Sequence, residues 1–286
     1  RQGVRTFFKQ PLALAGLFFI FVALMTILSQ IPFIGIPLAM TLLPAATLGL
    51  MAATKEATLG RFPMPSVLLT AFRSGQPELR VMGLLGGLYA LGFLGVVGMS
   101  ALIDGGNFVS IYLGGSKPSQ EIMMQGDFQT AMWVFMGLHL PLSLLFWHAP
   151  ALLHWHGLPP GKSLFFSIVA CVRNFWAYLV FGLAWVALLV LVLIVVSTLA
   201  ALLGSPNFAA TLMFPLVLVL ASMFFTSLYF SFQGSFALPE EADEPELRHL
   251  SRVVFRFSRR RYGRLIELIH RLNDLAAQSV QGNCDS

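Results

Sequence analysis

Charged side chains are scarce in this sequence. Asp, Glu, Lys and Arg together make up 11% of its 286 residues, whereas a soluble domain has about 25%. Hydrophobic residues make up 57%, and apolar stretches of about 20 residues recur through most of the chain, long enough to cross a hydrocarbon core as helices. The composition therefore excludes an ordinary soluble domain and indicates a helical protein that crosses a membrane several times.

The apolar stretches also lack the alternation of apolar and polar residues that a transmembrane β-barrel shows; residues 183–203 read LAWVALLVLVLIVVSTLAALL. Cysteine is equally scarce. The chain has two cysteines, Cys171 and Cys284, which are too few for a disulfide framework. We expect both to be free thiols.

Catalytic signatures are absent as well, because the sequence contains no GxSxG, HExxH or P-loop motif. The acidic residues of the apolar region are scattered between the predicted helices, so metal-assisted hydrolysis and phosphoryl transfer have no obvious residues. We therefore expect a protein that is not an enzyme and that has no cofactor or metal site.

Six predicted membrane-spanning helices account for the apolar region. Their connections alternate in charge: Lys and Arg gather at both termini and in every second connection, whereas the remaining connections are uncharged or acidic overall. The positive-inside rule then places both termini in the cytoplasm. The predicted spans are residues 12–30, 34–53, 80–103, 129–149, 175–203 and 208–232.

Two connections on the basic side share a pattern of Gly, Pro and Ser, followed by a short amphipathic stretch that ends in Arg. They are Gly60–Ser74 and Gly157–Asn174, and each predicts a short helix in the cytoplasmic interface of the membrane. The two units form a parallel repeat rather than the inverted repeat common in alternating-access carriers. Arg73 and Arg173, near the ends of these helices, are candidate lipid contacts.

Residues 146–157, FWHAPALLHWHG, contain three histidines and two tryptophans. His154 and His156 are two residues apart and point in nearly opposite directions on a helix, so a metal or haem site is the less favoured interpretation. Trp147 and Trp155 fit the aromatic belt of a membrane interface. We expect the segment to be the cytoplasmic end of the fourth span, closed by the Gly-Leu-Pro-Pro at 157–160.

His139 is the one readily ionisable side chain deep inside a predicted span, two residues before Pro141. Such residues are costly in the membrane and often functional. The alternative is a neutral His139 that donates to a backbone carbonyl of a neighbouring helix. Pro141 also leaves the carbonyl of Gly137 without its helical partner. His139 and Pro141 are therefore candidate functional residues, although His139 has no intramembrane acid with which to form a proton relay.

The third predicted span is rich in glycine, and Gly83 and Gly87 form a GxxxG pattern. Glycine lets helices approach closely, either within one bundle or between two copies of the chain. Packing within the bundle is the favoured interpretation, and a homo-oligomer is the alternative.

The C-terminal region differs in composition from the predicted transmembrane domain, residues 1–236. Residues 237–247 form an acidic linker, and residues 248–286 have the pattern of a basic amphipathic helix that includes Arg259, Arg260 and Arg261. Such a helix beside a membrane span is expected to lie on anionic lipid, with a partner helix as the second interpretation. Nucleic acid is not expected, since no platform of aromatic and basic residues accompanies the arginines.

The segment WHAPALLHWHGLPPGKSLFFSIVACVRN, residues 147–174, resembles a family of multi-pass inner-membrane proteins of betaproteobacteria. The likeness continues in KQPLAL, IPFIGIPLAMTLLPAATLGLMAA and SALIDGG, and covers about residues 1–236. More distantly, the chain is similar to the helical, non-catalytic membrane regions fused to glycerophosphodiesterases. The family has no established activity, so the resemblance implies a multi-pass membrane protein and no particular reaction.

The function that we expect is that of a non-enzymatic inner-membrane protein that interacts with anionic lipids or acts as a scaffold. The alternative is a transporter or channel for a small solute, with His139 near the middle of the membrane.

Overall fold

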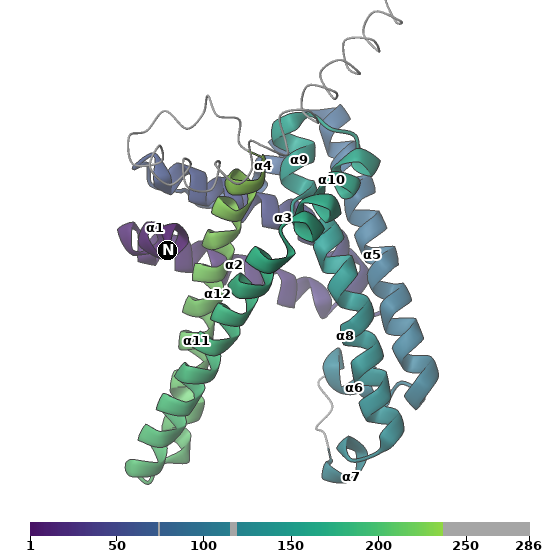
Figure 1. Cartoon of the computed structure of the whole chain (residues 1–286), viewed down its shortest axis with the longest axis vertical. Helices are drawn as coiled ribbons and strands as arrows, with labels where there is room; N and C mark the ends of the chain where they lie inside the picture. The colour runs from purple at the N-terminus through teal and green to yellow at the C-terminus, as the bar shows by residue number, and fades with distance from the viewer. Residues whose placement is uncertain (74, 115–118, 237–286) are drawn as a thin grey trace, which may run out of the picture. The chain divides into compact units, whose positions relative to one another are not determined.

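The computed structural model describes residues 1–73, 75–114 and 119–236, and every regular element in these ranges is helical (Figure 1). The all-α prediction is confirmed, and six helices are long and apolar enough to cross a membrane. The predicted linker at 237–247 and the predicted tail at 248–286 lie outside the described residues. The six long helices are α2 (Pro11–Ser29), α3 (Gly35–Thr58), α5 (Gln76–Asp104), α8 (Gly126–Phe146), α11 (Phe175–Leu202) and α12 (Pro206–Phe236).

Seven shorter helices connect or precede the long ones. Short helices are present at both places where the sequence predicts interfacial helices: a 3-10 turn with one α-helical turn at the first, and a full helix at the second. The short elements are α1 (Gln2–Lys9), η1 (Pro65–Leu69), α4 (Thr70–Arg73), α6 (Asn107–Tyr112), α7 (Gln120–Met123), α9 (Ala149–His156) and α10 (Pro160–Arg173).

A break between α8 and α9 interrupts the end of the predicted fourth span. Pro150 explains it, because the proline ring occupies the space of the Phe146 carbonyl four residues earlier and the residue has no N–H to donate. Trp147 and His148 form a bend between the two helices, although their dihedral angles stay in the right-handed helical region. The chain resumes as α9, which ends at Gly157 in the left-handed conformation (φ 62°), so the predicted glycine stop is confirmed.

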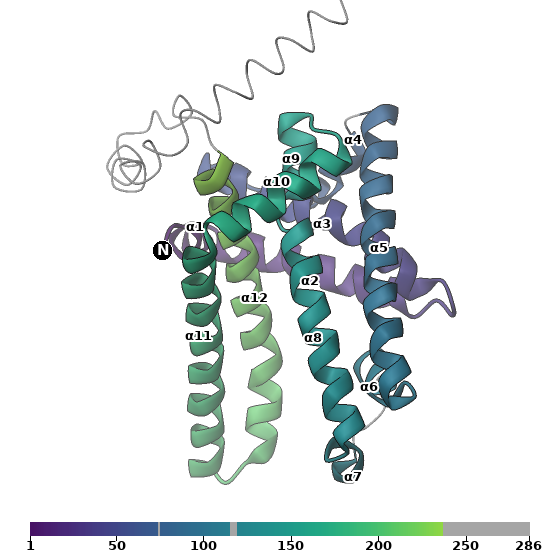
Figure 2. The ribbon, with the colours of Figure 1, turned by 45° about the vertical axis from the view of Figure 1, so that its right-hand side comes forward.

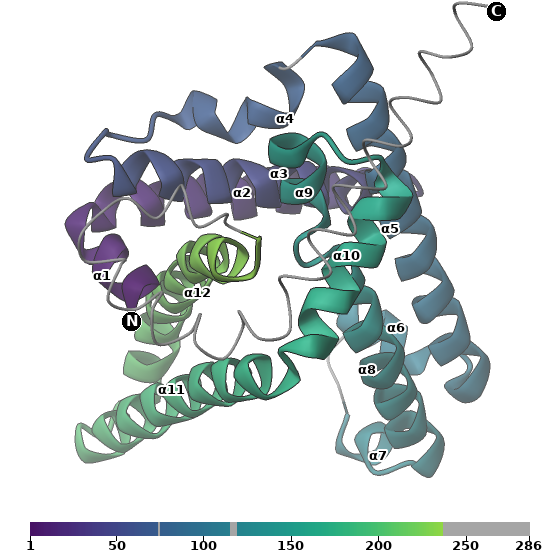
Figure 3. The ribbon, with the colours of Figure 1, turned by 45° about the horizontal axis from the view of Figure 1, so that its top comes forward.

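The long helices are arranged as two antiparallel pairs and a crossing hairpin. α5 packs along α8, and α11 runs beside α12, with the ring of Trp185 lying 5.7 Å from that of Phe224 (Figure 2). The α2–α3 hairpin runs across these pairs instead of alongside them (Figures 1 and 3). Length and composition do not distinguish the hairpin from the other long helices, so its direction is a finding of the structure.

Glycines on α5 set how closely its neighbours approach. A methyl group at Gly86 would collide with the carbonyl oxygen of Thr41 on α3, and one at Gly92 would meet the Leu142 side chain of α8 at 2.7 Å. A methyl group at Gly83 or Gly87 would meet nothing within 4 Å. Close packing within the bundle therefore uses Gly86 and Gly92 and not the GxxxG pair that the sequence singles out.

Charge separates the two ends of the bundle. The C-terminal end of α3, α4, the start of α5, α9 and α10 gather at one end, which we call the basic end, while α6 and α7 lie at the opposite end (Figure 2). The basic end holds Lys55, Arg61, Arg73, Arg80, Lys162 and Arg173, and the opposite end holds Asp104, Glu121 and Asp127.

At the opposite end, the Asp104 carboxylate caps α6. It accepts hydrogen bonds from the N–H groups of Gly106 (2.9 Å) and Phe108 (2.6 Å). This cap explains why the DGGNF sequence turns sharply after α5 and does not continue as a loose loop.

Candidate functional site

His139 lies in the middle of α8 among aromatic rings. Its imidazole stacks on Phe135 with 5.4 Å between centroids and meets the edge of Phe93 on α5 at 6.0 Å. The Nδ1 atom is buried and has no hydrogen-bond partner among the described residues. His139 is thus held by ring packing, which leaves its Nδ1 atom as an unused acceptor or donor.

Pro141 lies inside α8 and does not end the helix, which continues to Phe146. The Pro141 side chain is exposed, and the neighbouring Leu142 packs against Gly92. The structure therefore places Pro141 on the outer surface of the bundle, while His139 faces α5.

A buried polar network surrounds the break between α8 and α9. The His148 side chain is fully buried, and its Nε2 atom lies 2.7 Å from the hydroxyl of Tyr178 on α11. The same hydroxyl lies 3.0 Å from Ser235 Oγ and 3.1 Å from Ser231 Oγ, both on α12. We call these four residues the His148 network, because they join the break between α8 and α9 to α11 and α12.

In the His148 network, donors and acceptors can be assigned from the hydrogen bonds that each hydroxyl group makes. Ser235 Oγ–H donates to the carbonyl of Ser231 at 3.0 Å, so Ser235 accepts from the Tyr178 hydroxyl. Ser231 donates to the Tyr178 oxygen, whose second lone pair remains for His148 Nε2–H. This arrangement uses each of these donors once and corresponds to a neutral His148 with its proton on Nε2; in the other tautomer the Tyr178 hydroxyl donates to Nε2 instead.

The helix α10 satisfies the backbone groups that the proline break exposes. The N–H of His148 donates to Ser167 Oγ at 3.0 Å, and Ser167 Oγ–H donates to the carbonyl of Leu144 at 2.9 Å. Without Ser167, the buried N–H of His148 would lose this partner, which costs about 1–3 kcal/mol, whereas the Leu144 carbonyl would still accept from the N–H of Trp147 at 3.4 Å.

The polar and apolar faces of α10 are reversed relative to a helix of a soluble protein. Ser163, Ser167 and Cys171, spaced four residues apart, are buried against α8 and α9. Phe165 and Val172 are 60% and 63% exposed. Burial raises the pKa of the Cys171 thiol to about 12. The outward side of α10 is therefore an apolar surface.

The two tryptophans of the FWHAPALLHWHG segment are half-buried inside the bundle. Trp147 meets Phe224 of α12 edge to face at 5.9 Å. Trp155 lies 5.2 Å from Phe232 of α12, and Lys55 Nζ of α3 lies 5.5 Å from the Trp155 ring centre. The Trp147 ring therefore joins the break between α8 and α9 to α12, and the Trp155 ring joins α9 to α3 and α12; the role of both rings in an aromatic belt stays a prediction.

The three histidines of the segment diverge. His148 points to Tyr178, His154 Nδ1 lies 3.4 Å from Glu78 on α5, and the His156 ring packs at 5.7 Å from Phe232. Among the described residues, no group of three or more His, Cys, Asp or Glu side chains could hold one metal ion.

The candidate lipid contacts of the short helices are exposed at the basic end: Arg73 in the last turn of α4 and Arg173 in the last turn of α10. Phe72 and Val172, their neighbours in the chain, are also exposed. Arg259, Arg260 and Arg261 lie outside the described residues.

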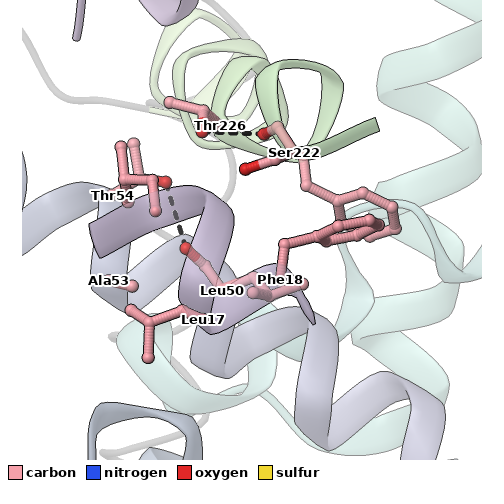
Figure 4. Close-up of a pocket in the computed structure, with 9 residues that line it drawn as sticks. Leu17, Phe18, Leu50, Ala53, Thr54, Ser222 and Thr226 are labelled. Carbon is pink, nitrogen blue, oxygen red and sulfur yellow. Dashed lines mark hydrogen bonds between the residues drawn. The ribbon is translucent and has the colours of Figure 1, made fainter. Parts of the chain in front are cut away.

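A small pocket lies between α2, α3 and α12 (Figure 4). Most of its lining is apolar, with Leu17, Phe18 and Phe225 among the walls. The hydroxyls of Thr54 and Thr226 donate to carbonyls of their own helices at 3.0 and 2.9 Å. These two donors are therefore already used, and the pocket offers little to orient a polar ligand. His139 is not part of its lining.

The fold defines a class of protein: an all-α membrane protein with six helices, among the described residues, that are long and apolar enough to span a membrane. A relative from Burkholderia thailandensis, named "Probable inner membrane protein", is 36% identical over 254 residues, which cover 88% of this chain and 94% of the relative. The chain belongs to the family of this inner-membrane protein. No protein-family model matches the chain, and no solved structure matches it.

Proposed function

We propose that the protein is a non-enzymatic inner-membrane protein whose basic end binds the headgroups of anionic lipids. The observation that carries the proposal is the outward side of α10, where exposed Phe165 and Val172 stand beside Lys162 and Arg173. An apolar helix face flanked by cations suits the boundary between acyl chains and anionic headgroups.

A second short helix supports the same function. In α4, exposed Phe72 precedes exposed Arg73, and Leu69 at the end of η1 is exposed as well. Each Lys or Arg near an anionic surface contributes about 1 kcal/mol to the attraction. Cations on two separate helices at one end would therefore favour anionic over zwitterionic lipid by a measurable margin.

The proposal includes that the protein is not an enzyme. The burial and the hydrogen bond of the His148 side chain support this part of the proposal. His148 has no exposed surface, and its Nε2 atom bonds to Tyr178. A histidine without access to a substrate cannot act as a general base on it. Ser167, the nearest buried hydroxyl, is committed to the Leu144 carbonyl.

The test uses the full chain in lipid nanodiscs that contain equal amounts of phosphatidylglycerol and phosphatidylcholine. Native mass spectrometry of the released protein counts the lipids of each kind that remain bound. We expect a preference for phosphatidylglycerol, and we expect the double variant Arg73→Gln, Lys162→Gln to lose much of it. The charge-conserving double variant Arg73→Lys, Lys162→Arg is the matched control and should retain the preference. An unchanged preference in the neutralised variant would refute the proposed headgroup site.

Removal of residues 248–286 tests the predicted role of the tail separately. We expect the shortened chain to retain less phosphatidylglycerol than the full chain while it keeps the contribution of α4 and α10. Equal retention by the two chains would leave the tail without a role in lipid binding.

The alternative, a transporter or channel for a small solute, draws on the unpaired Nδ1 atom of His139. Phe135 stacks on the His139 ring, and Phe93 meets this ring edge to face. We favour lipid binding because the exposed cations and rings already form a surface, whereas a solute would have to displace this ring packing.

A further inference from the structure

We infer that the α2–α3 hairpin does not cross the membrane: it enters from the basic end, turns back near the middle of the bilayer, and places Phe33 among lipid acyl chains. The chain then crosses the membrane four times, through α5, α8, α11 and α12. Helix length alone permits six crossings, so the assignment depends on the depth at which the hairpin packs.

The contact between Gly86 and Thr41 fixes the depth of α3 against α5. At 1.5 Å per residue, the part of α5 between Gly86 and Asp104 is about 27 Å long. Between Thr41 and the start of α3 at Gly35 only about 9 Å remains. Even if α3 ran along α5, the turn between α2 and α3 would stop about 18 Å short of the level of Asp104.

The position of the bilayer along α5 shows how deep the turn between α2 and α3 lies in the membrane. Arg80 and Asp104, near the two ends of α5, are about 36 Å apart along the helix, slightly more than a hydrocarbon core of about 30 Å. The midpoint of this interval lies near Gly92, and the contact at Gly86 lies about 9 Å towards the basic end. Gly35, the first residue of α3, therefore reaches the midplane at most, and the turn that precedes it lies close to that level.

The packing of α2 on α12 independently shows that the hairpin does not reach the far side of the membrane. The ring of Phe21 lies 6.1 Å from that of Phe225, and Phe18 lies 5.2 Å from the same ring. From Phe225 to the far end of α12 at Pro206 the helix measures about 28 Å, whereas α2 extends only about 12 Å beyond Phe21. The hairpin tip is thus about 16 Å or more short of that end, in agreement with its crosswise direction in Figures 1 and 2.

The turn at residues 30–35 is built for surroundings without water. The N–H groups of Ile34 and Gly35 donate to the carbonyls of Pro32 (2.8 Å) and Ile31 (2.9 Å), and those of residues 30 and 31 donate back into α2. Pro32 has no N–H. In hydrocarbon each unpaired backbone donor costs several kcal/mol, so a turn that pairs nearly all of its own donors suits that position.

Apart from exposed Gln30, the side chains at the tip suit acyl chains as occupants of the surrounding space. Phe33 is 99% exposed, with φ 64°, and Ile31 and Ile34 are exposed beside it. Residues 10–54 contain no charged side chain. The polar Thr26 and Ser29 donate their hydroxyls to α2 carbonyls at 2.9 and 2.8 Å. A tip that faced water would expose three large apolar side chains to it.

The two ends of the hairpin are held together at one place. Gln10 Nε2, just before α2, donates to the carbonyl of Arg61, just after α3, at 3.2 Å. Arg61 in turn pairs with Glu56 at 2.6 Å. Both ends are therefore at the polar boundary while the turn between them is apolar, as a hairpin that enters and leaves on one side requires.

The experiment places a cysteine at the tip of the full chain. In the Cys284→Ser background, Phe33→Cys is treated in cells with a membrane-impermeant maleimide, and in nanodiscs it carries a nitroxide spin label. We expect no maleimide labelling of Phe33→Cys from either side of the membrane. We also expect its nitroxide to be highly accessible to oxygen and poorly accessible to a water-soluble nickel chelate.

Gln120→Cys on α7 and Ser205→Cys between α11 and α12 are the matched controls, because both residues lie at the opposite end of the bundle. Both should react with the maleimide from one side, and their nitroxides should be accessible to the nickel chelate. If Phe33→Cys fails to fold, Ile34→Cys takes its place. Maleimide labelling of position 33 or 34 together with positions 120 and 205 would overturn the inference and show a hairpin that spans the membrane.

Discussion

At the scale of single residues, the hydroxyl of Tyr178 has three polar neighbours on two other segments of the chain. It is the one atom of the His148 network that touches all the others. Its removal would leave a fully buried imidazole without its partner at Nε2, and the loss of a buried partner costs more than the net gain from forming the bond.

We predict that Tyr178→Phe lowers stability by about 1–2 kcal/mol, within the range for hydrogen bonds inside membrane proteins. The measurement is the thermal unfolding midpoint in detergent. Tyr112→Phe is the control, because Tyr112 is more than half exposed and loses the same single oxygen. Equal midpoints for the two variants would show that the network does not stabilise the fold.

The thiol of Cys171 leads to a prediction about reactivity. Burial raises its pKa to about 12, so only about one thiol in 10⁴ is ionised at pH 8, and the thiolate is the nucleophile. We predict that Cys284→Ser protein does not react with N-ethylmaleimide between pH 7 and 9 until it is denatured, as measured by intact mass.

The control for this prediction moves the thiol by one residue. Cys171→Ala, Val172→Cys, Cys284→Ser protein carries its thiol at an exposed position of the same helix, and it should react in the folded state. Stoichiometric modification of folded Cys284→Ser protein at pH 8 would contradict the buried thiol.

At the scale of elements, the contact between α3 and α5 depends on the absence of a side chain at Gly86. We predict that Gly86→Ala lowers stability by about 1–3 kcal/mol, because the new methyl group forces α3 away from α5. Gly83→Ala is a matched control three residues earlier, where the methyl group meets nothing within 4 Å. Unfolding midpoints in detergent that fall equally in both variants would contradict the assigned contact.

The helices themselves are predictable from the sequence, but the direction of one helix pair is not. Hydrophobic stretches of about 20 residues predict the six long helices, and Gly157 with its prolines predicts the end of α9. The pattern does not give the direction of the α2–α3 hairpin, since an apolar helix has the same composition whether it stands upright or lies across its neighbours. That direction depends on close approaches such as Gly86 to Thr41, which no local periodicity reports.

For the candidate site, the sequence pattern predicts a functional role for His139 and places His148 near the end of the fourth span. The structure gives His148 three partner helices: α10 through Ser167, α11 through Tyr178 and α12 through the ring of Phe232. Two signals for this were present: Pro150, which breaks the helix just after His148, and the spacing of Ser163, Ser167 and Cys171 by four residues. Their meaning depends on α10 folding back against α8, which is a tertiary contact.

At the scale of the whole molecule, the separation of charge between the two ends predicts the orientation of the chain. By the positive-inside rule, the basic end and both termini face the cytoplasm. We predict that green fluorescent protein fused after residue 286 is fluorescent, and that alkaline phosphatase fused after Gln120 is active. An active phosphatase at the C-terminus together with an inactive one at Gln120 would reverse the orientation.

The uncharged stretch from residue 10 to residue 54 also has a consequence for biosynthesis. A hairpin that returns to its starting side gives the insertion machinery no hydrophilic segment to translocate, and its turn at Pro32 and Phe33 pairs nearly all of its own backbone donors. These two helices can therefore partition into the lipid as one preassembled unit, before α5 emerges. Among the connections, only those that follow α5 and α11 then require transport across the bilayer.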